Sequence, residues 1–185
     1  MAASRRVHDR VILDALDAIA PKPFEGEVWR ITGKDSEPLR GSSTHGRWSP
    51  NGEFEVLCTS LERDGALAEI GYRLSLEPVW PSRIQHAIHR IQLRTERTLH
   101  LADLAALQPL GVDTTKYQGF DYETTQAITA AAHFLMFDGL LVPSARAPCS
   151  NLVIFLDRIA EYGRMEVRES EPVDWNAWRL NRKPA

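Results

Sequence analysis

The residues best suited to chemistry lie on a polar loop that follows a short predicted strand. Gly46 and Arg47 are adjacent there. A glycine lets a ligand approach the backbone closely, and a guanidinium offers a planar fork of donors that fits a phosphate or a carboxylate. Arg30, on the preceding strand, would add a second positive group, and two arginines suit a diphosphate. The alternative is that both arginines are ordinary surface residues.

One acidic residue stands out on a predicted helix. Glu69 lies between Leu67 and Ile70, at the edge of the apolar face of that helix. A carboxylate beside a core needs a partner or a function. The simpler interpretation is an ion pair with Arg73, one helical turn later on the surface.

Two further groups could take part in a site. Tyr122 begins a long predicted helix, whose first turn has free N–H groups able to bind an anion or an amide. Thr124 or Thr125 could instead only cap that helix. Ser150 opens an apolar strand, and it either lines a site or merely turns the chain.

A thiol nucleophile is a third possibility. Cys149 would be the nucleophile and His133 its base, as in a thiol hydrolase. His133, however, lies beside the apolar stripe of the long helix, where a packed histidine is the simpler interpretation.

The elements that must position these residues alternate irregularly along the chain. Hydrophobic spacing predicts helices over 7–20, 61–76, 101–107 and 122–138, and strands over 27–32, 54–59, 87–94, 139–142, 151–156 and 165–168. Residues 33–52 form a long loop, and long loops in compact domains are often functional. The tail with Trp175 and Trp178 is predicted as a helical turn. Without regular βαβ alternation, the expected class is α+β.

Composition excludes several classes of protein. The chain has 185 residues, a net charge of −3 and two cysteines. That length suits one domain, and the charge argues against a nucleic-acid binder. Neither a disulfide framework, nor metal-ligand spacing, nor a secretory signal, nor a membrane span is indicated. We therefore expect a cytoplasmic protein without a metal.

Short motifs recur in a fixed order between residues 28 and 157. They are Trp29-Arg30, Pro38-Leu39, Gly41, Gly46-Arg47-Trp48, Gly52, Val56-Leu57-Cys58-Thr59, Ala66-Leu67-Ala68-Glu69, Leu141-Val142-Pro143-Ser144-Ala145-Arg146 and Ser150-Asn151-Leu152-Val153. In this order they resemble the RES family of bacterial toxins, which is named for a recurring Arg, Glu and Ser. The resemblance divides the chain into an N-terminal helical extension (1–27), the RES domain (28–157) and a C-terminal extension (158–185) packed on it.

The resemblance implies a fold, an activity and a set of site residues. RES domains resemble ADP-ribosyltransferase toxins, with a mixed β-sheet core and flanking helices. NAD⁺ is the implied substrate. Glu69 would be the catalytic carboxylate, and Arg47 and Arg30 would anchor the NAD⁺ molecule. Gly46 and Tyr122 would hold the carboxamide, and Ser150 would line the site.

The resemblance also implies what becomes of ADP-ribose and what restrains the enzyme. The acceptor is water, phosphate or a protein side chain, and an Xre-like antitoxin blocks the site. Cys58 departs from the family, which has a Tyr that helps to hold the nicotinamide end. A thiol does not stack or donate like a phenol. The alternative is a degenerate domain that only binds its antitoxin.

Overall fold

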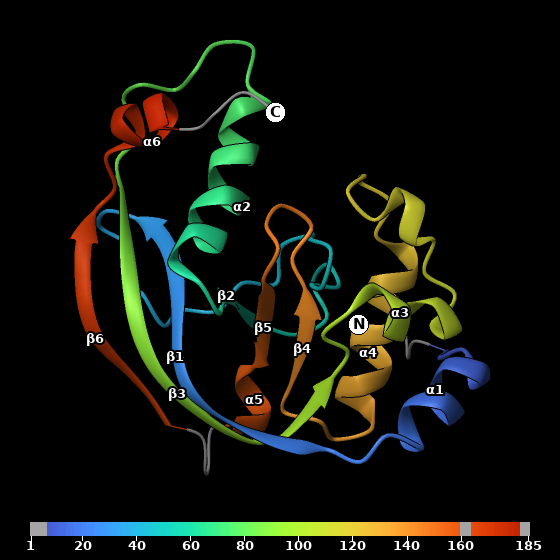
Figure 1. The fold of residues 1–185 in the computed structure, drawn as a ribbon. Helices are drawn as coiled ribbons and strands as arrows, with labels where there is room; N and C mark the ends of the chain where they lie inside the picture. Colours follow the sequence, from blue (N-terminus) through green and yellow to red (C-terminus); the bar gives the residue numbers. More distant parts are fainter. Residues whose placement is uncertain (1–6, 160–163, 182–185) are drawn as a thin grey trace.

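The computed structural model describes residues 7–159 and 164–181, and it confirms an α+β fold (Figure 1). Residues 1–6, which belong to the predicted N-terminal extension, and residues 182–185 of the predicted C-terminal one lie outside this description, as do residues 160–163. The helices are α1 (Arg10–Asp17), α2 (Arg63–Ser75), α3 (Leu104–Leu107), α4 (Glu123–Phe134), α5 (Leu156–Ile159) and α6 (Trp175–Asn181), with 3-10 turns at Gln108–Leu110 and Thr114–Lys116. The strands are β1 (Lys22–Gly33), β2 (Val56–Ser60), β3 (His86–His100), β4 (Gly139–Pro143), β5 (Ser150–Phe155) and β6 (Arg164–Pro172).

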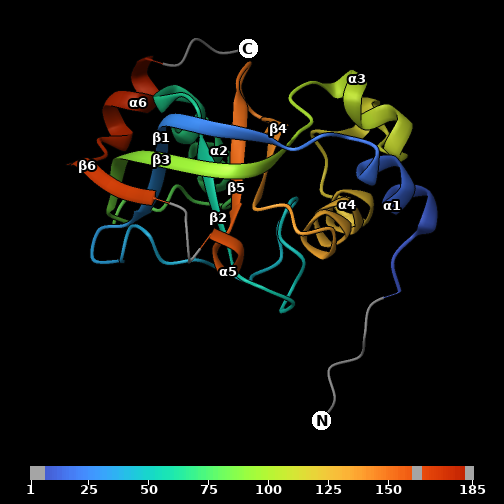
Figure 2. The same cartoon turned by 90° about the horizontal axis from the view of Figure 1, so that it is seen from below.

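The six strands form one strongly curved sheet in the order β1-β2-β5-β4-β3-β6, and β1 also pairs with β3. The long strands β1, β3 and β6 make one half, and the short strands β2, β5 and β4 make the other (Figure 1). The two halves join where the end of β3 runs parallel to β4 and where Trp29 of β1 pairs with Ser60 of β2. Figure 2 shows α4, α1 and α3 grouped beside the β4 side, away from α2 and α6.

Several strands are longer than the hydrophobic pattern predicts, among them β6, which continues to Pro172 beyond the predicted end at Arg168. β1 extends the predicted 27–32 segment at both ends, and β3 continues six residues beyond Arg94. The reason is pairing: residues 22–33 and 86–98 are antiparallel partners along their length, so backbone hydrogen bonds sustain the strands even where the side chains are polar. The predicted domain divisions at 27/28 and 157/158 fall within β1 and α5.

The long helix ends earlier than predicted. We expected it to reach Asp138, but α4 stops at Phe134, and Met136 has a left-handed φ of 66°. The fully buried Asp138 carboxylate accepts hydrogen bonds from the backbone N–H groups of Glu96 and Arg97, both at 2.7 Å. These bonds draw the chain out of the helix and into β4, because a buried carboxylate must be fully hydrogen-bonded.

The core lies in three places. One cluster, with Leu16, Ile128 and Phe155, joins α1 and α4 to one face of the short strands. A second, with Val28 and Leu152, fills the space between the two halves of the sheet. The third packs α2 and α6 against β1 and β3. Within the described ranges, no helix is long and apolar enough to cross a membrane.

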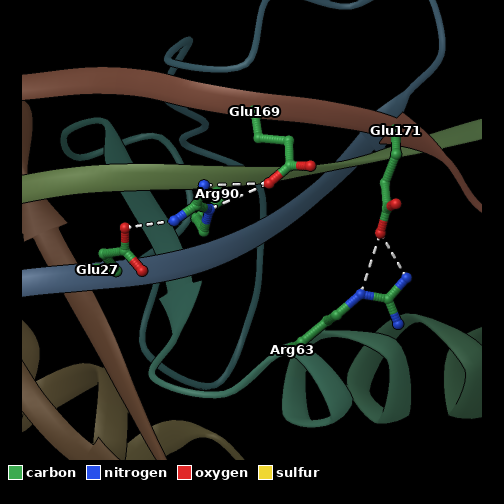
Figure 3. Close-up of polar contacts among 5 residues, drawn as sticks. All are labelled: Glu27, Arg63, Arg90, Glu169 and Glu171. Atoms are coloured by element: carbon green, nitrogen blue, oxygen red, sulfur yellow. Dashed lines mark hydrogen bonds and ion pairs between the residues drawn. The ribbon is translucent and has the colours of Figure 1, made fainter.

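Ion pairs tie the long strands to one another and to α2 (Figure 3). Arg90 of β3 contacts Glu27 of β1 at 2.7 Å and Glu169 of β6 at 3.1 Å. Arg63, in the first turn of α2, contacts Glu171 of β6 at 2.6 Å. All five side chains are partly exposed, so each pair stabilises the fold only modestly.

The C-terminal helix is fitted against α2. The predicted helical turn at Trp175 and Trp178 is confirmed as α6, and the Trp178 ring lies directly over Gly71. A methyl group at Gly71 would overlap that ring. Because Gly71 has no side chain, α6 can pack closely on α2, the helix that carries Glu69.

We expect Gly71→Ala to destabilise the protein by about 1–3 kcal/mol, because the indole must shift, although alanine favours a helix. Urea unfolding measures the change. In the Trp178→Ala background, where the obstructing ring is absent, the same substitution should cost nothing or stabilise the protein. An equal cost in both backgrounds would contradict this packing.

Candidate active site

A cavity of about 280 Å³ opens between α2, the loop over residues 42–49, and one face of β2 and β5. Five of the seven predicted site residues line it: Arg30, Gly46, Arg47, Cys58 and Glu69. Tyr122 and Ser150, the other two, are not among its lining residues. The structure therefore brings the two arginines and the acidic residue around a single space.

The first turns of α4 hold the loop in place. The Gln126 side-chain amide donates to the carbonyl oxygen of Gly46 at 2.7 Å, and the Thr125 hydroxyl donates to the carbonyl oxygen of Arg47 at 2.7 Å. The loop has no strand of its own beyond isolated bridges, so these bonds fix its course. The start of the predicted helix thus acts on the loop that carries Arg47.

Arg47 is held between two aromatic rings. Its guanidinium carbon lies 4.6 Å from the ring centre of Tyr117 and 4.9 Å from that of Tyr122, and Nη2 donates to the carbonyl oxygen of Gly119 at 2.9 Å. Tyr122 therefore supports the site through Arg47. Burial lowers the pKa of Arg47, although the tyrosines and Glu69 oppose the shift. The guanidinium stays charged, and only one of its five donors is used here.

Arg30 is positioned by backbone oxygens. Nη1 donates to the carbonyl oxygen of Cys58 at 3.2 Å and Nη2 to that of Arg40 at 3.0 Å. Burial lowers the pKa of Arg30, with the Cys58 thiol acting in the opposite direction. Neither Arg30 nor Arg47 forms an ion pair with a carboxylate among the described residues. Two half-buried cations without counter-ions favour an anionic ligand.

Glu69 is oriented by two neutral donors. Its Oε1 accepts a hydrogen bond from the Ser144 hydroxyl at 2.6 Å and another from the Asn151 side-chain amide at 3.1 Å. No ion pair between Glu69 and Arg73 occurs in the described part of the chain, so the surface-pair interpretation is wrong. Because both bonds go to one oxygen, Oε2 is left for other contacts.

Sequence reasoning selected Ser150 and missed both groups that hold Glu69. Side chains alternate along a strand, and Ser150 falls on the same face of β5 as Leu152 and Ile154, which pack between the halves of the sheet. Asn151 falls on the opposite face, with the cavity. Ser144 lies in the Leu-Val-Pro-Ser motif just beyond β4, so that motif contained the missed signal.

The Cys58 thiol also faces the cavity, from the middle of β2. Loss of hydration deep in the cavity raises the pKa of Cys58, whereas the positive charges of Arg30 and Arg73 lower it. The thiol therefore lies among the cationic side chains that line the cavity.

The alternative nucleophile has no base. Cys149 Sγ lies 3.5 Å from the Ser60 hydroxyl. His133 is bonded to Asp157 at 2.9 Å and is stacked on Phe54 with 3.9 Å between ring centres. The two side chains have different partners, so the thiol-hydrolase hypothesis has no support in the geometry.

Unsatisfied polar groups gather in the cavity wall. Six buried side-chain nitrogen or oxygen atoms lack a hydrogen-bond partner in the described residues, and four belong to lining residues: Arg30, Trp48, Ser49 and Asn151. Such groups are rare in folded proteins and concentrate at functional sites. A search of the described residues for three or more clustered metal-ligand side chains finds no group.

The chain matches a family model and several named proteins. The family model described as "RES domain" matches residues 27–176. The chain is 36% identical over 169 residues to a Mycobacterium tuberculosis protein named "Probable NAD(+) phosphorylase Rv3189", covering 84% of this chain and 79% of that one. It is 23% identical to the NAD(+) phosphorylase MbcT of Mycobacterium bovis, covering 88% and 90% of the two chains.

The fold is also similar to a solved structure. The match is to the crystal structure of the M. tuberculosis MbcT-MbcA toxin-antitoxin complex, with a TM-score of 0.82 and 21% identity. It covers 93% of this chain and 97% of that chain. At this identity, the likeness shows a shared fold.

The buried Tyr117 beside Arg47 should make stability sensitive to high pH. Its hydroxyl donates to the Pro143 carbonyl oxygen at 2.7 Å, and burial raises the pKa of Tyr117 to about 12. An unfolded tyrosine has a pKa of about 10, so the contribution of Tyr117 is complete below pH ~10 and lost as the pH rises to ~12.

Urea unfolding between about pH 9 and 12 tests this. The wild type should lose about 2–3 kcal/mol more than Tyr117→Phe over the interval. Parallel pH profiles for the two proteins would contradict the assignment.

Proposed function

Since this chain belongs to the RES domain family, we propose that it is an enzyme that cleaves NAD⁺ between nicotinamide and ribose. The observation that carries the proposal is the single cavity in which an oriented carboxylate, Glu69, faces two arginines without counter-ions. The names of the relatives, which are NAD(+) phosphorylases, support the same substrate.

The chemistry follows from the charges. As the bond to nicotinamide breaks, the ribose carbon becomes cation-like, much as in glycoside cleavage. Glu69 stabilises this charge, and it does so effectively because Ser144 and Asn151 fix its orientation before the reaction begins. Arg47 and Arg30 bind the diphosphate and keep the sugar beside the carboxylate. Nicotinamide leaves as a neutral molecule and needs no acid.

The acceptor of ADP-ribose is proposed from the relatives. Their names favour inorganic phosphate over water. Transfer to a protein side chain, and a relation of this sheet to the ADP-ribosyltransferase toxins, rest only on the resemblance seen in the sequence.

We also infer that the chain is the toxin of a toxin–antitoxin pair, because the MbcT fold is found in such a complex. An Xre-like antitoxin would stop turnover by covering the mouth of the cavity. The exposed Phe120, one residue beyond the carbonyl group that Arg47 binds, lies at a suitable place for that contact.

Glu69→Gln should reduce NAD⁺ turnover by about 10²–10³-fold. Glutamine keeps an oxygen for Ser144 and Asn151 but removes the charge. Release of nicotinamide by the purified protein is the measurement, and Glu77→Gln, an exposed carboxylate just after α2, is the matched control. Wild-type turnover in Glu69→Gln would refute the assignment, whereas a wild type that consumes no NAD⁺ would favour the degenerate-domain alternative.

Arg47→Ala should raise the KM for NAD⁺ by about 10–100-fold, because charged hydrogen bonds to phosphate are lost. The KM for NAD⁺ of Arg47→Lys should lie between those of the wild type and Arg47→Ala, since lysine keeps the charge but not the fork of donors. Arg40→Ala is the control, because only the backbone carbonyl of Arg40 is used, by Arg30. Steady-state kinetics with an unchanged KM in Arg47→Ala would exclude this anchor.

A further inference from the structure

The cavity contains a third guanidinium group. Ala66, Glu69, Ile70 and Arg73 line it from one face of α2, at the spacing of successive helical turns. Arg73 lies one turn beyond Glu69, so its α-carbon is about 6 Å farther along the helix. Its side chain is exposed, at the outer part of the cavity.

This cation has no partner within the described parts of the chain. Arg63, at the other end of the same helix, is bound by Glu171 at 2.6 Å (Figure 3). Arg73, in contrast, makes no side-chain hydrogen bond or ion pair among the described residues, and Glu69 is bound by Ser144 and Asn151 instead. Three arginines and a single carboxylate give the cavity an excess of positive charge.

The cavity has more positive charge than one bound dinucleotide requires. The diphosphate of NAD⁺ carries two negative charges, which Arg30 and Arg47 would match. Arg73 lines the cavity one helical turn from Glu69, so its charge lies on the same helix face as the carboxylate. A further anion beside the reacting sugar would account for a third cation there.

We propose that Arg73 binds the inorganic phosphate that accepts ADP-ribose, an inference that rests on the proposed function. Because Arg73 and Glu69 share one helix face, the phosphate would lie beside the carboxylate. The guanidinium offsets the repulsion between these two anions. A phosphate held in place competes with water for the sugar, and so the residue sets the product.

The step balances without another reactant. A phosphate oxygen forms a bond to the ribose carbon while the bond from that carbon to the pyridinium nitrogen breaks. The electron pair of the broken bond stays on nitrogen, which releases neutral nicotinamide. The products are nicotinamide and ADP-ribose 1-phosphate, and nothing is oxidised or reduced.

Kinetics with varied inorganic phosphate and saturating NAD⁺ test the subsite, with products separated by chromatography. Arg73→Ala should raise the KM for phosphate about tenfold or more, leave the KM for NAD⁺ within about twofold, and shift the product toward free ADP-ribose. Arg73→Lys should keep part of the phosphate affinity. Arg63→Ala, on the same helix but outside the cavity, should behave as wild type.

The outcomes separate this inference from the proposed function. An unchanged KM for phosphate in Arg73→Ala overturns the phosphate subsite. An equal rise in the KM for phosphate and the KM for NAD⁺ also overturns it, because Arg73 would then bind the dinucleotide. Wild-type cleavage of NAD⁺ that ignores phosphate overturns the subsite alone.

A wild type that leaves NAD⁺ intact overturns the proposed function, and calorimetric titration with inorganic phosphate then decides the subsite by itself. Wild type and Arg63→Ala should bind phosphate about tenfold or more tightly than Arg73→Ala. Equal binding by all three proteins would refute the assignment.

Discussion

The hydrogen bonds that Ser144 and Asn151 donate to one oxygen of Glu69 are the interaction on which the rest of the site depends. They join α2 to the end of β4 and the start of β5, and so they set the direction of the carboxylate. Neutral donors suit this task better than an arginine, because they orient the carboxylate without cancelling its charge.

The arginines have two kinds of partner in this structure. Outside the cavity, Arg63 and Arg90 are paired with glutamates, and these pairs bind one element to the next. In the cavity, Arg30 and Arg47 are held by backbone carbonyl oxygens and aromatic rings instead. Such contacts fix a guanidinium in place without pairing it with a carboxylate, so the arginines give the cavity an excess of positive charge.

The sequence predicted much of this architecture, and its failures have physical causes. Hydrophobic spacing located all six strands and most of the helices approximately, because local periodicity reflects burial, but it missed the short helix α5. The lengths of β1 and β3 depend on pairing between distant segments, and the end of α4 on the contacts of Asp138, neither of which is a local property. The order of the motifs predicted that Arg47 and Glu69 lie around one cavity. Whether Ser150 or Asn151 faces that cavity depends on which face of β5 lines it, and this is not a local property of the sequence.

The spacing of the groups that orient Glu69 has a consequence for biosynthesis. Its two donors lie 75 and 82 residues farther along the chain, and the helix that packs on α2 comes later still. A ribosome that has translated Glu69 has therefore made only an isolated carboxylate. Incomplete chains that stop before β4 lack both donors, so premature termination yields fragments without the assembled centre. The orientation of Glu69 is therefore complete only after β5 has been synthesised.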